Sequence, residues 1–329
     1  SEWEFFPEGK QIAIKNSDDR SFIPTRFALS NIGKWCSINP SHIEKILDDS
    51  PDELDIEMLC LTLNHRKGRH HYTNKEEERE LLFRTYNDNT LRAVLTTSYS
   101  PIDNRWFLEV LKDLIPGGRV SHQRGDADDL FANILIPDTI RYDTDSDYGG
   151  LFAVRNSEIG KASLDCLPAL FRAICRNGCV WNKTEGLNFR KVHKGEIKLD
   201  GLAVQIGECL DKQIKLIPEI MEKFLSLRQY EFAPELMLGV FAAVAERFKM
   251  TAKQGESMLN EFFAHESDSM SAFGVVNSIT RASQLYTPNV TEQFDKIGGS
   301  LAGGNWDGLK NRANSMSQDE IAKVLNLTA

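Results

Sequence analysis

The chain lacks the long uncharged apolar runs that membrane-spanning helices need. Such a helix requires about 20 consecutive apolar residues, and no window of the 329-residue sequence approaches that length. The opening residues, SEWEFFPEGK, contain neither a basic stretch nor an apolar stretch of the kind found in secretion signals. We therefore expect a cytoplasmic protein with no membrane partner.

Cysteine pairs at metal-binding or redox spacing are also missing, since the sequence contains no CxxC. The cysteines lie in apolar or helix-like stretches, which predicts reduced and mostly buried thiols rather than a disulfide framework. They are Cys36, Cys60, Cys166, Cys175, Cys179 and Cys209.

Signatures of common active sites are absent as well. There is no GxSxG and no HExxH, and no set of residues combines a nucleophile, a base and an orienting group. The glycine-rich stretch at Gly298–Gly304 has no Gly-Lys-Ser/Thr and follows no expected strand, so it does not fit a P-loop. We expect a flexible linker there, with a phosphate cradle as the alternative. The sequence thus favours a binding protein without a cofactor over an enzyme.

Acidic clusters near the middle of the chain suggest cation sites but fail the test of spacing. A calcium loop that begins at Asp143 needs Gly at its sixth position and Glu at its twelfth, where this chain has Tyr148 and Val154. We therefore expect solvated turns and no metal. A metal-dependent enzyme acting on nucleic acids or nucleotides remains the alternative, through Asp126, Asp128, Asp143 and Asp145.

What is present is the composition of a globular protein, with 41% hydrophobic and 26% charged residues. Apolar periodicity predicts strands at 91–97, 130–136, 151–155 and 179–181. It predicts helices that begin near Asn39, Asp52 and Asp103, and further helices at 161–176, from 202 with a kink or break at Pro218, at 234–249, at 254–265, at 270–286 and after Ser317. Residues 1–35 are expected to form an arm with one or two short strands.

This order of elements predicts an α+β fold, with a central, mainly antiparallel sheet and packed helices, followed by a C-terminal helical bundle. We expect four segments: an N-terminal arm and helices at 1–78, an α+β core at 79–200, a helical domain at 201–290, and a glycine-rich linker with a last helix at 291–329. The pair of helices around 244–263 is interpreted as a packed αα-hairpin rather than a DNA-reading motif, because its second helix carries Glu256 and Glu261.

Two basic segments stand out in a chain whose net charge is −9. The segment 172–198 has seven basic and two acidic residues, a balance of 7 − 2 = +5, and it includes Trp181 and Phe189. The segment 65–72 has three fixed positive charges and no acid. Cations that neutralise phosphates, combined with rings that stack on bases, suit single-stranded nucleic acid. The alternative is a solvated hairpin with both rings in the core.

A polar group before the expected helix at 161–176 adds a second phosphate-binding candidate. Asn156 would cap that helix, and the N–H groups of a helix start attract anions. Arg155 lies beside it, and Arg172 and Arg176 would share one helix face. Salt bridges to structural acids are the alternative for these arginines.

Several short stretches resemble the phage/plasmid-like protein family, a domain family of unknown function found on bacteriophages and mobile elements. They are LRAVL at 91–95, YSPIDN at 99–104, AVRNSEIG at 153–160, FRAICRNG at 171–178 and AFGVVNSIT at 272–280, so the resemblance covers about residues 80–290. The family pattern has His at Glu158 and Asp at Ile159, and its basic-His pair corresponds to Arg190 and His193. The resemblance implies a mobile element in a bacterial cytoplasm and hints at DNA handling. It brings no catalytic residues.

The resulting hypothesis is a non-enzymatic, oligomeric protein that binds single-stranded DNA or RNA in replication or recombination, with strand annealing as its most specific form. Alternatives are the metal-dependent enzyme above and a phage structural or host-interaction protein. The expected nucleic-acid-binding residues are Arg155, Asn156, Arg172, Arg176, Lys183, Arg190, Lys191 and Lys194, with Arg66, Lys67 and Arg69 as a second patch.

Overall fold

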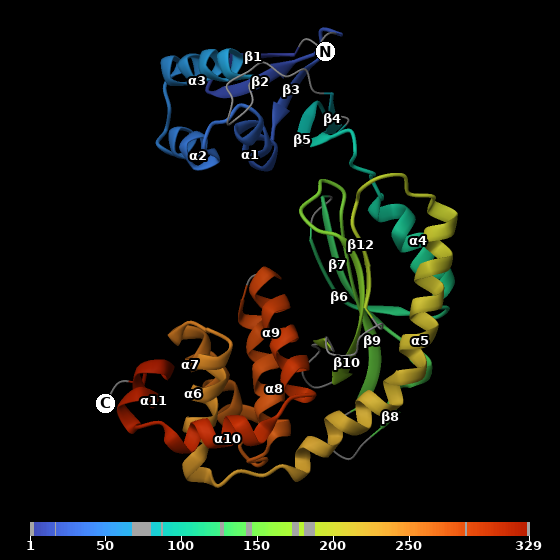
Figure 1. The fold of residues 1–329 in the computed structure, drawn as a ribbon, viewed down its shortest axis with the longest axis vertical. Helices are drawn as coiled ribbons and strands as arrows, with labels where there is room; N and C mark the ends of the chain where they lie inside the picture. Colours follow the sequence, from blue (N-terminus) through green and yellow to red (C-terminus); the bar gives the residue numbers. More distant parts are fainter. Residues whose placement is uncertain are drawn as a thin grey trace. The chain divides into compact units, whose positions relative to one another are not determined.

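The computed structural model describes residues 3–16, 18–67, 80–86, 88–125, 128–142, 147–172, 178–180, 188–286 and 288–327. The chain forms two compact units. The first contains residues 1–102, 157–162 and 193–197, and the second contains 103–156, 163–192 and 198–329 (Figure 1). The expected boundary at 78/79 therefore falls inside the first unit.

The first unit is built on a five-stranded sheet in the order β1-β2-β3-β5-β4. Its strands are β1 (Glu4–Glu8), β2 (Gln11–Lys15), β3 (Ser21–Pro24), β4 (Leu81–Thr85) and β5 (Thr90–Thr96). Neighbouring strands of this sheet pair antiparallel, except β3 and β5, which pair parallel. Helices α1 (Arg26–Trp35), α2 (Pro40–Asp48) and α3 (Glu53–Arg66) share one apolar core with this sheet.

The expectation of an N-terminal arm over residues 1–35 is wrong, because this stretch forms β1, β2, β3 and α1. Each strand has only four or five residues. Such short stretches show little periodicity, and β3 is completed by β5, which lies far along the chain. The expected strand at 91–97 is confirmed as β5.

The predicted starts of α2 and α3 are confirmed at atomic detail. The Asn39 side chain accepts a hydrogen bond from the Ser41 amide at 3.0 Å, with Pro40 in the first helical position. Asp52 and Asp55 form a reciprocal capping box, with N–H···O distances of 2.8 and 3.1 Å.

The second unit contains the larger sheet, in the order β11-β10-β9-β7-β6, with β12 added to β10 and β8 to β9. Its strands are β6 (Arg119–Gly125), β7 (Asp129–Leu135), β8 (Arg141–Tyr142), β9 (Asp147–Ser157), β10 (Leu164–Arg172), β11 (Gly178–Val180) and β12 (Phe189–Lys191). Helix α4 (Asn104–Leu114) precedes the sheet in the chain, and α5 (Leu199–Ser226) packs along it (Figure 1).

Close packing holds α5 against β9 and β10. A Cβ atom added at Gly150 on β9 would lie only 2.3 Å from Ile217 Cδ1. Gln213 Nε2 donates to the Cys166 carbonyl on β10 at 3.2 Å. Pro218 does not divide α5, which remains one helix of 28 residues and curves along its length (Figure 1).

The helix expected at 161–176 is wrong, because Leu164–Arg172 is strand β10. Apolar residues occur here on both sides of the strand, and a strand covered on both faces has no clear period of two. The signal against a helix was Pro168, which would lose a hydrogen bond inside one. It follows that Asn156, on strand β9, is not a helix cap, and that Arg172 lies on a strand rather than on a helix face.

The expected C-terminal helices are confirmed as α6 (Met237–Arg247), α7 (Ala252–His265), α8 (Ala272–Ala282) and α11 (Gln318–Leu325), whereas α10 (Trp306–Ser315) was not predicted. The linker expected at Gly298–Gly304 is wrong, since Gly298 and Gly299 lie inside α9 (Pro288–Ala302). Phe294 and Leu301 on α9 are almost completely buried, and tertiary packing of such a face outweighs the poor helix propensity of glycine. Across the described ranges, none of the helices has the length and apolar character that a bilayer crossing requires.

The contact at Gly150 gives a test of how closely α5 and the sheet pack. We expect Gly150→Ala to lower the free energy of unfolding by about 1–3 kcal/mol, because three atoms of Ile217 must move. Gly201→Ala in α5 is the control, since its added methyl meets no atom within 4 Å. It should be neutral or stabilise by up to about 1 kcal/mol. Urea denaturation of both variants measures this, and equal effects would contradict the packing.

Candidate functional site

A row of charged residues crosses three neighbouring strands of the larger sheet. In the register of the sheet, Asp165 on β10 stands directly opposite Arg155 on β9 and opposite Arg190 on β12. Directly opposed residues point to the same face of a sheet. This face is opposite to the one that α5 covers, because side chains alternate along β10 and the neighbouring Cys166 is on the α5 side.

The cations of this row converge on one carboxylate. Arg190 Nε lies 3.8 Å from Asp165 Oδ1, and the Arg190 side chain is 71% exposed. Lys296, an exposed residue of α9, also interacts electrostatically with Asp165. We call Arg155, Asp165, Arg190 and Lys296 the basic row; its formal charge is 3 − 1 = +2.

The carboxylate in the row is held in place. Ser163 Oγ lies 3.2 and 3.1 Å from the two Asp165 oxygens. Burial raises the pKa of Asp165, while the Ser163 hydrogen bond and the three surrounding cations oppose this rise. Asp165 therefore keeps the cations together on one face, at the cost of some desolvation of its own charge.

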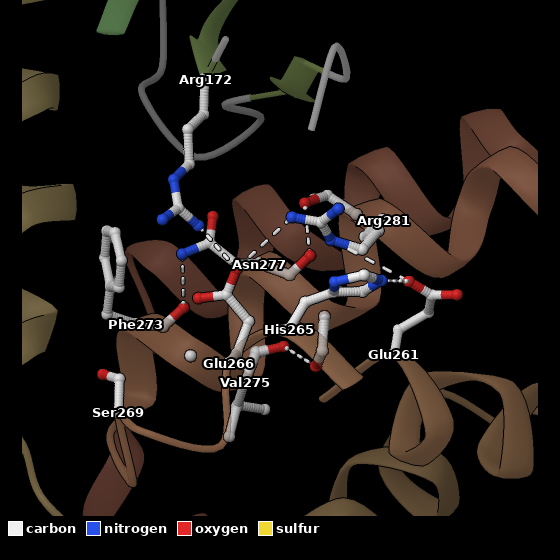
Figure 2. A network of polar contacts seen from close by, with 12 residues as sticks. Arg172, Glu261, His265, Glu266, Ser269, Phe273, Val275, Asn277 and Arg281 are labelled. Carbon is white, nitrogen blue, oxygen red and sulfur yellow. Dashed lines mark hydrogen bonds and ion pairs between the residues drawn. The ribbon is translucent and has the colours of Figure 1, made fainter. Parts of the chain in front are cut away.

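Arg172, at the other end of β10, points away from this face into a buried network (Figure 2). Its Nη1 lies 2.7 Å from Glu266 Oε1, and its guanidinium lies 5.2 Å from the centre of the Phe273 ring. Arg281 Nη2 is 3.8 Å from the same Glu266 oxygen. Since Arg172 is only 8% exposed, its charge serves to attach β10 to α8 and to the end of α7.

The other predicted binding residues are spread over both units. Asn156 is fully buried, and its Nδ2 donates to Asn104 Oδ1 at 2.8 Å. Lys191 is half-buried on β12. Exposed Lys194 belongs to the first unit, as do the two described residues of the second patch, Arg66 and Lys67. Arg69, Arg176 and Lys183, together with Trp181, lie outside the described residues.

The first unit contains an aromatic pair, buried His193 and half-buried Tyr99, that the sequence motifs did not reveal. The His193 ring stacks on Tyr99, with 5.3 Å between ring centres and 12° between their planes. His193 Nδ1 lies 3.2 Å from the Ser100 carbonyl, and Tyr99 Oη donates to the Ser157 carbonyl at 2.9 Å. His193 Nε2 is buried and has no hydrogen-bond partner among the described residues.

Burial lowers the pKa of His193, and the nearby Arg84 guanidinium lowers it further, against the effect of the Ser100 carbonyl. Arg84 also belongs to an ionic cluster, because Glu158 Oε2 lies 3.4 Å from Arg84 Nη2 and 2.9 Å from Arg92 Nη2. The Arg92 guanidinium in turn lies 4.4 Å from the centre of the Tyr86 ring. Glu158 thus attaches the turn at 157–162 to β4 and β5.

No metal centre is formed within the part of the chain that the structure describes, where no three His, Cys, Asp or Glu residues gather. Of the carboxylates expected in the metal-dependent alternative, Asp128 is described and is 9% exposed. Asp126, Asp143 and Asp145 lie outside the described residues.

Fold and charge together define an α+β protein with a cluster of cations on one face of its larger sheet. Comparison with known families matches residues 92–318 to a domain of unknown function, DUF932. The match covers more than half of the chain, which therefore belongs to this family. No curated protein and no solved structure matches it. The expectation of a domain of unknown function over most of the chain is thus confirmed. The resemblance to the phage/plasmid-like family, and with it the mobile-element setting, stays a prediction.

Because Arg172 is paired inside the protein, its replacement should lower the stability of the fold strongly. Replacing Arg172 by Met leaves Glu266 with a weaker partner inside the protein, so we expect a loss of about 3 kcal/mol in the free energy of unfolding. Lys223→Met breaks the exposed pair with Glu219, whose side chains are 58% and 59% exposed, and should cost less than about 1 kcal/mol. Chemical denaturation compares the two, and a negligible loss for Arg172→Met would show that its ion pair is not structural.

The lowered pKa of His193 predicts a dependence of stability on pH. The unfolded chain takes up a proton near the ordinary pKa of about 6.5, while the folded protein takes it up only at lower pH. Stability should therefore fall as the pH is lowered below about 6.5. Part of this loss should disappear in His193→Gln but persist in the variant at exposed His42, His42→Gln. Identical pH profiles for all three proteins would contradict the inference.

Proposed function

We propose that this protein binds single-stranded DNA or RNA through its phosphates, with the basic row as the contact. The observation that carries the proposal is the alignment of Arg155 and Arg190 on either side of Asp165 across three strands, with Arg190 Nε 3.8 Å from the Asp165 carboxylate. Lys296 of α9 also acts electrostatically on this carboxylate. The net charge of the whole molecule is −9, so a local group of cations is the part of it that can attract phosphates.

The geometry of the row suits a flexible anionic strand. Arg190 is highly exposed at an edge of the described sheet, and Lys296 is exposed on α9. Phosphates that displace water and counterions from such side chains gain affinity without base recognition. Phe189 is half-buried next to Arg190. Base stacking is therefore a smaller part of this proposal than the contacts with phosphate.

The biological setting that we propose is DNA replication or recombination on a phage or other mobile element, with strand annealing as its most specific form. This part of the proposal is supported by the resemblance of residues 80–290 to a mobile-element family. Annealing would require the protein to hold two strands at once, which an oligomer carrying several basic rows favours.

Binding is tested with a labelled single-stranded oligonucleotide over a range of salt concentrations. We expect affinity to fall steeply with salt, and the double variant Arg190→Ala/Lys296→Ala to bind roughly tenfold more weakly at low salt. Removing two phosphate contacts should also reduce the slope of log affinity against log salt by about 1.4.

The control is Arg105→Ala/Lys323→Ala, which removes the same total charge from exposed residues of α4 and α11. It should retain the affinity and the salt slope of the original protein. Equal weakening by both double variants would reveal only nonspecific attraction, and absence of binding at low salt would reject the proposal.

A further inference from the structure

Helix α3 has apolar side chains on two opposite faces. Ile56, Leu59, Cys60 and Leu63 are buried in the core of the first unit. On the other side, Leu54 is 63% exposed, and Met58 and Leu61 are each 57% exposed. In the described part of the first unit, all large hydrophobic side chains with this degree of exposure lie on α3.

These exposed residues form a stripe whose spacing is the same in both directions. Leu54, Met58, Leu61 and exposed His65 follow one another at intervals of four, three and four residues, so all lie on one side of the helix. We call these four residues the α3 stripe. Reversing the helix places His65 where Leu54 was and Leu61 where Met58 was, so the stripe matches a reversed copy of itself.

Charge is distributed along α3 in the same complementary way. The beginning of the helix is acidic, with Asp52 as its cap followed by Glu53, Asp55 and Glu57. The end is basic, with Arg66 in the last turn followed by Lys67. Two copies side by side in the same direction would bring like charges together, whereas an antiparallel pair brings each acidic end beside a basic end.

We propose that two copies of this chain associate through antiparallel packing of their α3 stripes about a two-fold axis. Met58 of one copy faces Leu61 of the other, and Leu54 faces His65. Asp55 and Arg66 are eleven residues apart, close to three helical turns, so both lie on the same flank of the stripe. In the two-fold pair, Asp55 of each copy therefore lies beside Arg66 of the other.

The second copy is the occupant that fits both observations. A different partner would need neither a stripe with symmetric spacing nor opposite charges at its two ends, whereas a two-fold interface requires each surface to be its own complement. The 14-residue helix is about 21 Å long, so the contact is smaller than a standard stable interface and predicts a reversible dimer in the micromolar range.

The test measures the mass of the nucleic-acid-free full chain by sedimentation velocity over a concentration series. We expect a concentration-dependent dimer, and a rise of at least tenfold in its dissociation constant for Met58→Glu. The control is Val204→Glu, which changes an equally prominent side chain, 61% exposed on α5. A chain that stays monomeric up to about 100 µM, or a dimer that Met58→Glu leaves intact, would overturn the proposal.

A charge exchange tests the direction of the pairing. Asp55→Arg and Arg66→Asp should each weaken the dimer several-fold, and the double variant should recover most of the loss. Asp55 also belongs to the capping box of α3, but the double variant lacks that cap as well, so recovery cannot come from helix stability. Failure to recover would overturn the antiparallel arrangement. Neither measurement depends on nucleic-acid binding.

Discussion

The alternation of side chains along β10 governs the distribution of charge in the second unit. Asp165 and Arg172 are seven residues apart on this strand and therefore point to opposite faces. The face with Asp165 carries the basic row, while Arg172 reaches Glu266 and Phe273 on the helical side. Arg172 and Arg190 belong to the same basic segment of the sequence but have different roles. Arg172 forms a buried ion pair, whereas Arg190 is exposed on the opposite face of the sheet.

Burial explains why only some of the cations remain available to a ligand. Moving Arg172 out of water is costly, and the Glu266 carboxylate at 2.7 Å offsets that cost. If a ligand bound Arg172 instead, the buried Glu266 charge would lose this partner, and the desolvation cost would no longer be compensated. Arg190 stands 3.8 Å from Asp165 and is 71% exposed, so a phosphate can approach it with little desolvation. Within the basic segment 172–198, the proposed function accordingly rests on exposed Arg190 rather than on buried Arg172.

The sequence predicted correctly those helix starts that depend on a capping side chain a few residues away. Asn39 and Asp52 cap their helices as expected, and Ser317 forms a capping box at the start of α11. The secondary-structure prediction was wrong where packing against distant parts of the chain determines the element. Strand β10 has buried apolar residues on both faces, so the sequence predicted a helix there, and Phe294 and Leu301 hold a glycine-rich stretch in α9. Of the basic row, the sequence indicated Arg155 and Arg190, but no local pattern connects them with Asp165 or Lys296.

By itself, the sequence determined the fold class, most helices and the excess of cations near residues 172–198, because periodicity, capping and charge are properties of short stretches. The tertiary structure decided which of those cations face solvent, since that depends on strand register and on the helices that cover each face. It also brought Lys296 to β10 and stacked His193 on Tyr99. Residues separated by about a hundred positions meet only when the apolar surfaces between them are buried together.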